Sequence, residues 1–176
     1  MKNANRLLCA AAAAGVALLL GRAAGGQVLP DAETREVRAY TLTEAGLEKY
    51  VAATRKLSGI RLSCADDEPG VDSLAAAAAK IDAVPGARAA VQSAGMTSRE
   101  YVVFAFALIE NAIAAYALEQ PGGALPPGIS MGNVEFFREH AAEMEKLASE
   151  TEDAGCAEDV GGGGATPLRA AARSTP

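Results

Sequence analysis

The chain has 176 residues, and 22 acidic side chains outnumber 16 basic ones, so its net charge is −6. Nucleic-acid backbones and anionic membrane surfaces both attract basic proteins, so this charge argues against partners of either kind. The sequence contains no GxSxG, P-loop, GxGxxG, HExxH or CxxCH motif. We therefore predict no catalytic residue, no metal ligand and no bound cofactor, and we favour a protein that is not an enzyme. A low-activity enzyme that uses Glu110 stays open as an alternative, although the sequence offers no second catalytic group for it.

The first 26 residues have the three parts of a secretory signal peptide. Lys2 and Arg6 give a basic start, residues 7–20 are apolar, and small residues follow. Cleavage after residue 26 would also remove Arg22 and no acid, so the net charge would fall from −6 to −9. We expect residues 1–26 to be a signal peptide and the protein to be periplasmic or secreted.

Two cysteines, Cys64 and Cys156, remain after such a cleavage. In an oxidising compartment a single pair of cysteines is most simply a disulfide, and we predict that these two form one. Free or intermolecular thiols stay open as alternatives. The acidic run at residues 66–68 lacks the alternating acids of a calcium loop, which indicates a solvated loop.

The remaining chain divides into an arm, a helical domain and a tail. Residues 27–41 lack helical periodicity and predict an extended arm, whereas residues 42–150 predict a helical domain. Residues 151–176 are rich in glycine and lack apolar periodicity, which is typical of a disordered tail. Caps, apolar spacing, glycine and proline predict helices over residues 43–58, 72–84, 86–94, 97–120 and 131–149.

The helix predicted over residues 97–120 is the longest apolar run after the signal peptide. Thr97 and Glu100 have the spacing of a capping box, and Pro121 ends the helix. A helix that is apolar all round is buried in a bundle or crosses a membrane. Because Glu110 would lie near the middle of a bilayer, where an acid is costly, we favour burial and expect no stable membrane insertion. The prediction is an all-α fold, a four- to five-helix bundle around this central helix.

Three polar residues on the apolar helices are candidates for a ligand pocket: Glu110, Asn111 and His140. A buried carboxylate needs a partner or a proton, so Glu110 is predicted either to pair with a Tyr, an Arg or His140, or to face a cavity. The function expected is a non-catalytic module that binds a small molecule or a protein. The alternative is a non-covalent haem or metal bundle centred on His140, with Met96 or Met131 as a second haem ligand.

The segment from residue 85 to 147 resembles a group of exported bacterial proteins of unknown function. The resemblance lies in AGMTSREYVVFAFAL (residues 94–108) and LPPGISMGNVEFFREHAAEME (residues 125–145). Those relatives also have a signal peptide and a YTLT-like entry to their first helix, here residues 40–43. The resemblance implies an exported helical domain and no particular activity or functional residue.

Overall fold

The computed structural model describes residues 29–60 and 72–152. All regular structure in these residues is α-helical, which confirms the predicted all-α class. The predicted signal peptide, both cysteines and residues 153–176 of the predicted tail lie outside the described residues. The helices are α3 (Asp31–Ala39), α4 (Glu44–Ser58), α5 (Leu74–Ala83), α6 (Ala87–Ser93), α7 (Ser98–Leu118) and α8 (Met131–Glu152).

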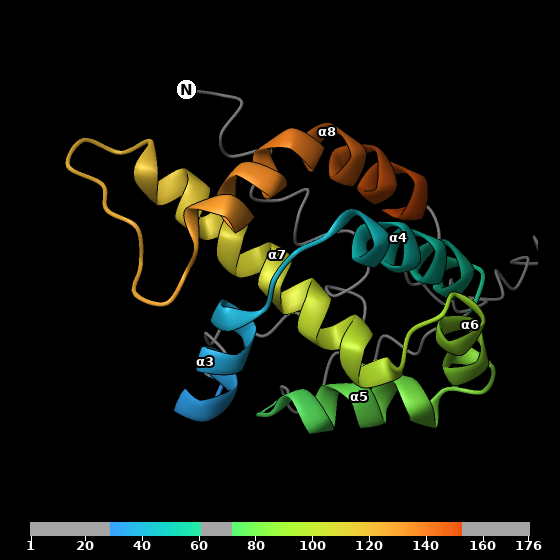
Figure 1. Ribbon diagram of the computed structural model, residues 1–176. Coiled ribbons are helices and arrows are strands. Elements are labelled where there is room, and N and C mark those ends of the chain that lie inside the picture. The colour runs from blue at the N-terminus through green and yellow to red at the C-terminus, as the bar shows by residue number, and fades with distance from the viewer. Residues whose placement is uncertain (1–28, 61–71, 153–176) are drawn as a thin grey trace, which may run out of the picture.

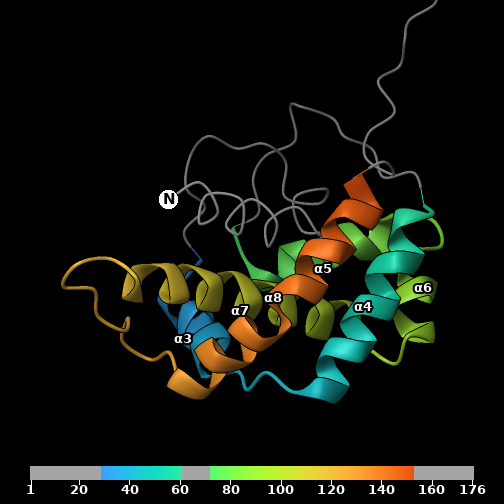
Figure 2. The same ribbon diagram turned by 90° about the horizontal axis from the view of Figure 1, so that it is seen from above.

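The predicted central helix is α7, and the other elements are arranged around it (Figure 1). Helices α3 and α5 lie along one side of α7, α8 crosses its other side, and α4 packs between α8 and α6 (Figures 1 and 2). The core consists of apolar residues from every helix, and Tyr50, Tyr101 and Phe104 are its largest fully buried side chains. The rings of Tyr101 and Phe104 stack on Tyr50 at centroid distances of 5.0 and 5.2 Å.

The predicted capping box begins α7. The amide of Glu100 donates to Thr97 Oγ1 over 3.1 Å, and the amide of Thr97 donates to Glu100 Oε2 over 2.7 Å. Elsewhere Thr43 caps α4 by accepting from the amide of Gly46, and Ser130 accepts from the amide of Asn133 at the start of α8. These bonds satisfy amides that the first turn of a helix leaves without a backbone partner.

Three predictions are corrected. The arm predicted to be extended over residues 27–41 contains helix α3, so the described part of the chain has six helices instead of four or five. The helix predicted to begin at residue 72 begins at Leu74, and Ser73 caps it by accepting from the amide of Ala76. The last helix continues to Glu152, and buried Thr151 donates to the carbonyl of Leu147, so the tail does not begin at residue 151.

Helix α3 forms although its sequence has no apolar stripe. It buries one apolar side chain, Val37, and hydrogen bonds that involve Glu33, Glu36 and Arg38 also join it to other helices. Asp31 and Glu33 lie in its first turn and Arg38 in its last, an order that complements the helix dipole. Tertiary contacts, absent from the local sequence pattern, therefore decide that this segment is helical.

Candidate functional site

Glu110 lies on α7 and is paired with an arginine of α3. Its Oε2 accepts from Arg38 Nε over 3.0 Å, and Arg38 Nη1 also donates to the carbonyl of Pro127 over 3.4 Å. The side chains of Arg38 and Glu110 are 31% and 28% exposed. Of the alternatives left open by the sequence, an arginine partner is the one observed. The pair ties α3 and the loop before α8 to α7.

Asn111 is the next residue of α7, and it points into the core. It is fully buried, and its Nδ2 donates to the carbonyl of Ala107 over 2.8 Å. Its Oδ1 has no hydrogen-bond partner among the described residues. Successive residues are about 100° apart around a helix, so Glu110 and Asn111 face different neighbours.

His140 lies on α8 between two acids. Its Nε2 is 2.8 Å from Glu44 Oε1 at the start of α4, and its Nδ1 is 3.6 Å from Glu143 Oε2. The imidazole packs against the ring of Phe136, with centroids 4.4 Å apart. A haem iron or a metal ion at Nε2 would have to displace Glu44. In residues 29–60 and 72–152, no group of three or more His, Cys, Asp or Glu side chains could hold a metal ion.

The three predicted ligand residues therefore lie in separate surroundings. No hydrogen bond or ion pair within the described part of the chain joins any two of them. Glu110 is bound to α3, Asn111 to its own helix and His140 to α4. Each side chain thus has a structural partner of its own.

A buried group of hydroxyls between α4 and α7 was not predicted from the sequence. Thr54 Oγ1 donates to the carbonyl of Tyr50 over 2.9 Å and lies 3.0 Å from the hydroxyl of Tyr101. Burial raises the pKa of Tyr101 to about 12 and raises the pKa of Tyr50 well above its ordinary value. Both phenols therefore stay protonated near neutral pH, which suits a structural role and not that of a general base.

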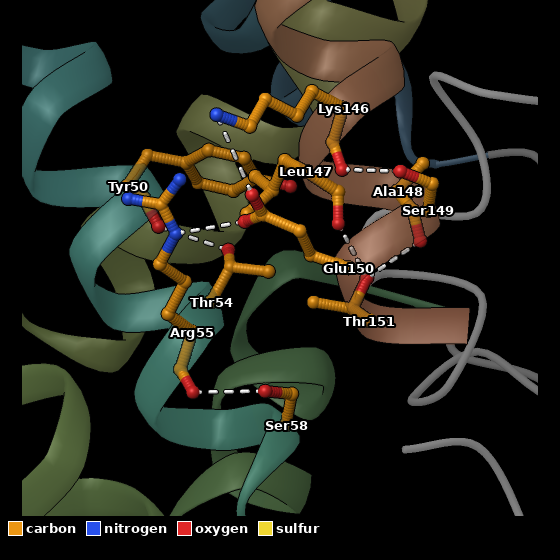
Figure 3. Close-up of polar contacts among 10 residues, drawn as sticks. All are labelled: Tyr50, Thr54, Arg55, Ser58, Lys146, Leu147, Ala148, Ser149, Glu150 and Thr151. Carbon is orange, nitrogen blue, oxygen red and sulfur yellow. Dashed lines mark hydrogen bonds and ion pairs between the residues drawn. The ribbon is translucent and has the colours of Figure 1, made fainter. Parts of the chain in front are cut away.

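An ion pair joins α4 to α8 at Arg55, the residue after Thr54 (Figure 3). Glu150 Oε2 accepts from Arg55 Nε over 3.0 Å, and its Oε1 is 3.8 Å from Lys146 Nζ. Glu150 and Arg55 are 36% and 51% exposed, so this group is a solvated contact between helices.

The prediction that α7 is buried on all sides is wrong for one face of its second half. Ile113 is 46% exposed and Tyr116 is 36% exposed, and Phe106 and Ile109 on the same side are only partly buried. We call Phe106, Ile109, Ile113 and Tyr116 the α7 strip. Val102, one turn before Phe106, is buried, and Ser98 Oγ donates to Asp82 of α5 over 2.6 Å. The first half of α7 is thus covered on this side, whereas the strip is partly covered at Phe106 and Ile109 and exposed at Ile113 and Tyr116.

Among the described residues, α7 is also the one helix long and apolar enough to cross a membrane. Of the 18 consecutive residues of α7 that are most apolar, 61% are buried inside the protein. Its length and composition fit a membrane span, and the extent of its burial fits the core helix of a bundle.

No protein-family model matches this chain, and no curated protein or solved structure matches it either. The resemblance to exported bacterial proteins therefore stays a prediction.

Proposed function

We propose that this protein is an exported, non-catalytic interaction module that binds a helix of a partner protein along the α7 strip. The observation that carries the proposal is the exposure of Ile113 and Tyr116 on a helix that is otherwise largely buried. Export rests on the signal peptide predicted at residues 1–26, with a periplasmic or secreted location to follow from it.

The spacing of the strip supports a helical partner. Ile109, Ile113 and Tyr116 stand at positions i, i+4 and i+7 of α7, the pattern by which helices present anchors to a groove or to a second helix. Tyrosine is enriched among the residues that dominate binding energy at interfaces. The strip is also bordered by Glu110 and Glu119, which could supply a polar rim.

The polar candidates support binding more than catalysis. Glu110 is occupied by Arg38, and His140 is bracketed by Glu44 and Glu143. The buried phenols of Tyr50 and Tyr101 keep their protons. Ser98 Oγ donates to Asp82 over 2.6 Å, and Arg88 also donates to that carboxylate. The hydrogen bonds from Ser98 and Arg88 lower the pKa of Asp82, which makes it a weaker base than covalent catalysis requires.

Site-specific photo-crosslinking tests the proposal. A photoreactive phenylalanine analogue replaces Ile113 or Tyr116 in the full chain, and the protein is irradiated in its native host. The control places the same analogue at Glu48, an exposed position on α4. We expect one defined adduct from positions 113 and 116 and none of that mass from position 48.

A second variant tests whether the partner is crosslinked because it binds the α7 strip. Ile113→Asp, introduced into a chain with the photoreactive group at 116, is expected to reduce the adduct at least about tenfold, because an acid in an apolar contact is left without a partner. Adducts of equal yield at positions 48, 113 and 116, or none at 113 and 116, would contradict the proposal.

A further inference from the structure

The stretch of chain that contains the α7 strip carries acidic side chains and no basic ones. No lysine, arginine or histidine occurs between Arg99 and Arg138, whereas glutamates stand at residues 100, 110, 119 and 135. This stretch includes most of α7, the loop after it and the start of α8. A cation beside the strip therefore has to come from another part of the chain or from a partner.

Arg38 of α3 supplies such a cation at one edge of the strip, where it donates to Glu110 over 3.0 Å. Glu119, at the C-cap of α7, is exposed, and within residues 29–60 and 72–152 its side chain has no ion pair or hydrogen bond. It stands three residues after Tyr116, and residues at this spacing are neighbours on the surface of a helix. The end of the strip thus carries an acid that the described part of the fold does not neutralise.

The charge of Glu119 is also unfavourable for the helix that it ends. The carbonyl groups at the C-terminus of a helix carry partial negative charge, which a base in the last turn offsets and an acid opposes. Helix α7 has no base in its last turn. Arg138 of α8 donates to the carbonyl of Ala115 over 3.3 Å and so satisfies one carbonyl of this end. A charge that opposes local stability is expected mainly at functional positions.

From this arrangement we propose that the partner helix of the α7 strip is basic, with lysine or arginine beside its apolar anchors. The anchors pack on Ile113 and Tyr116, and a basic side chain pairs with Glu119 at the negative end of α7. The inference rests on the proposed function, because it names the chemistry of the partner at the same strip. A second copy of the chain does not fit, because it brings the same uncompensated glutamate and a net charge of −6.

Three synthetic peptides test the charge of the partner. They share the leucine positions of one amphipathic helix, and their polar positions are all lysine, all glutamine or all glutamate. Each peptide carries fluorescein, and its binding to the full chain is measured by fluorescence anisotropy at one fixed ionic strength. We expect the lysine peptide to bind at least about tenfold more tightly than the glutamate peptide, with the glutamine peptide between them.

Two charge reversals show whether Glu119 causes this preference. Glu119→Lys and Glu48→Lys change the net charge equally, but Glu48 is an exposed residue of α4. We expect Glu119→Lys to weaken binding of the lysine peptide about three- to tenfold and Glu48→Lys to change it little. Lysine at the C-cap suits the helix dipole, so Glu119→Lys should fold. Equal losses in the two variants would mean that the peptide responds to net charge alone, and would overturn the inference.

Ile113→Asp separates apolar docking from attraction between charges. The variant is more acidic than the wild-type chain, so a peptide held by charge alone would bind it as tightly or more tightly. We expect at least about a tenfold loss for the lysine peptide, because the apolar contact acquires a charge without a partner. Unchanged or tighter binding would overturn the inference.

The outcomes also separate the inference from the proposed function. Equal binding of all three peptides that Ile113→Asp abolishes would overturn the basic partner and leave the strip as a site for a helix. No binding of the lysine peptide would overturn the inference, while the photo-crosslinked adduct still decides the proposed function. Binding of the chain to phosphatidylcholine vesicles that Ile113→Asp abolishes would assign the strip to a lipid surface and overturn both.

Discussion

The hydroxyl of Tyr101 lies 3.0 Å from the hydroxyl of Thr54, and this buried contact joins α7 to α4. Tyr101→Phe removes the contact and keeps the ring that stacks on Tyr50. We expect a loss of about 0.5–1.5 kcal/mol in the free energy of unfolding, the usual net contribution of one hydrogen bond. Urea unfolding measures it, and Tyr116→Phe at an exposed position is the control with little change. Equal losses in the two variants would contradict a role for the buried contact.

The buried phenols predict a loss of stability at alkaline pH. The folded-state pKa of Tyr101 is raised by burial from its ordinary value of 10.0 to about 12, and that of Tyr50 is raised well above the same value. A neutral buried phenol contributes its full stability to the fold below pH 10. That contribution falls as the pH rises from 10 toward 12, because the phenol ionises in the unfolded chain before it ionises in the folded one. Between pH 10 and 12 we expect each phenol to contribute a loss of about 1.4 kcal/mol per pH unit.

Urea unfolding of the wild-type chain and of Tyr101→Phe at pH 9 and pH 11 separates the two phenols. The variant should lose stability less steeply, because one of the two groups has been removed. The same dependence on pH in both proteins would show that Tyr101 ionises as readily when folded as when unfolded.

Two glycines in the first turns of helices should respond oppositely to alanine. A Cβ at Gly46 of α4 would lie 2.7 Å from Cε2 of Phe104, which is fully buried, whereas a Cβ at Gly132 of α8 meets nothing within 4 Å. We expect Gly46→Ala to destabilise the protein by about 1–3 kcal/mol, as overpacking does. Gly132→Ala should stabilise it by about 0.4–1 kcal/mol, because the unfolded chain loses freedom. Thermal unfolding compares them, and a gain in both would mean that α4 and α7 can separate freely.

Asn133 binds the connector between α3 and α4, residues 40–43, and we expect this side chain to contribute strongly to the stability of the protein. Replacing it with alanine removes the bonds to Tyr40 and Leu42 and leaves the amide of Leu42 without this acceptor. We predict a loss of about 2–4 kcal/mol for the two bonds together. Ser130→Ala, which removes a helix cap nearby, should cost only about 1 kcal/mol. A ranking in the opposite order, from chemical denaturation, would refute the assignment.

Local chemistry explains which helices were predictable. Two predicted features depend only on residues that are close together in sequence: the capping box of Thr97 and Glu100, and the apolar spacing of α4. The structure shows both. Helix α3 was missed because its stability depends on residues far away in sequence, such as Arg99 and Glu110. No pattern within residues 27–41 reports those contacts.

The site was less predictable for a related reason. A uniformly apolar run such as α7 has no periodicity, so it does not reveal that Val102 is covered while Ile113 is not. The arginine that pairs with Glu110 is 72 residues away, and the sequence left it as one alternative among several. The polarity of Glu110, Asn111 and His140 showed that these positions are unusual on apolar helices. It did not show that each has a different partner in the fold.

The account depends on α7 being packed by the protein's own helices with one strip left open to water. Hydroxyl-radical footprinting of the detergent-free chain, read by mass spectrometry along α7, measures this side chain by side chain. We expect strong oxidation of Ile113 and Tyr116 and protection of Tyr101, Phe104 and Leu108, which are buried. Equal oxidation of these five residues, or their equal protection in a chain that stays in solution only with detergent, would contradict the account.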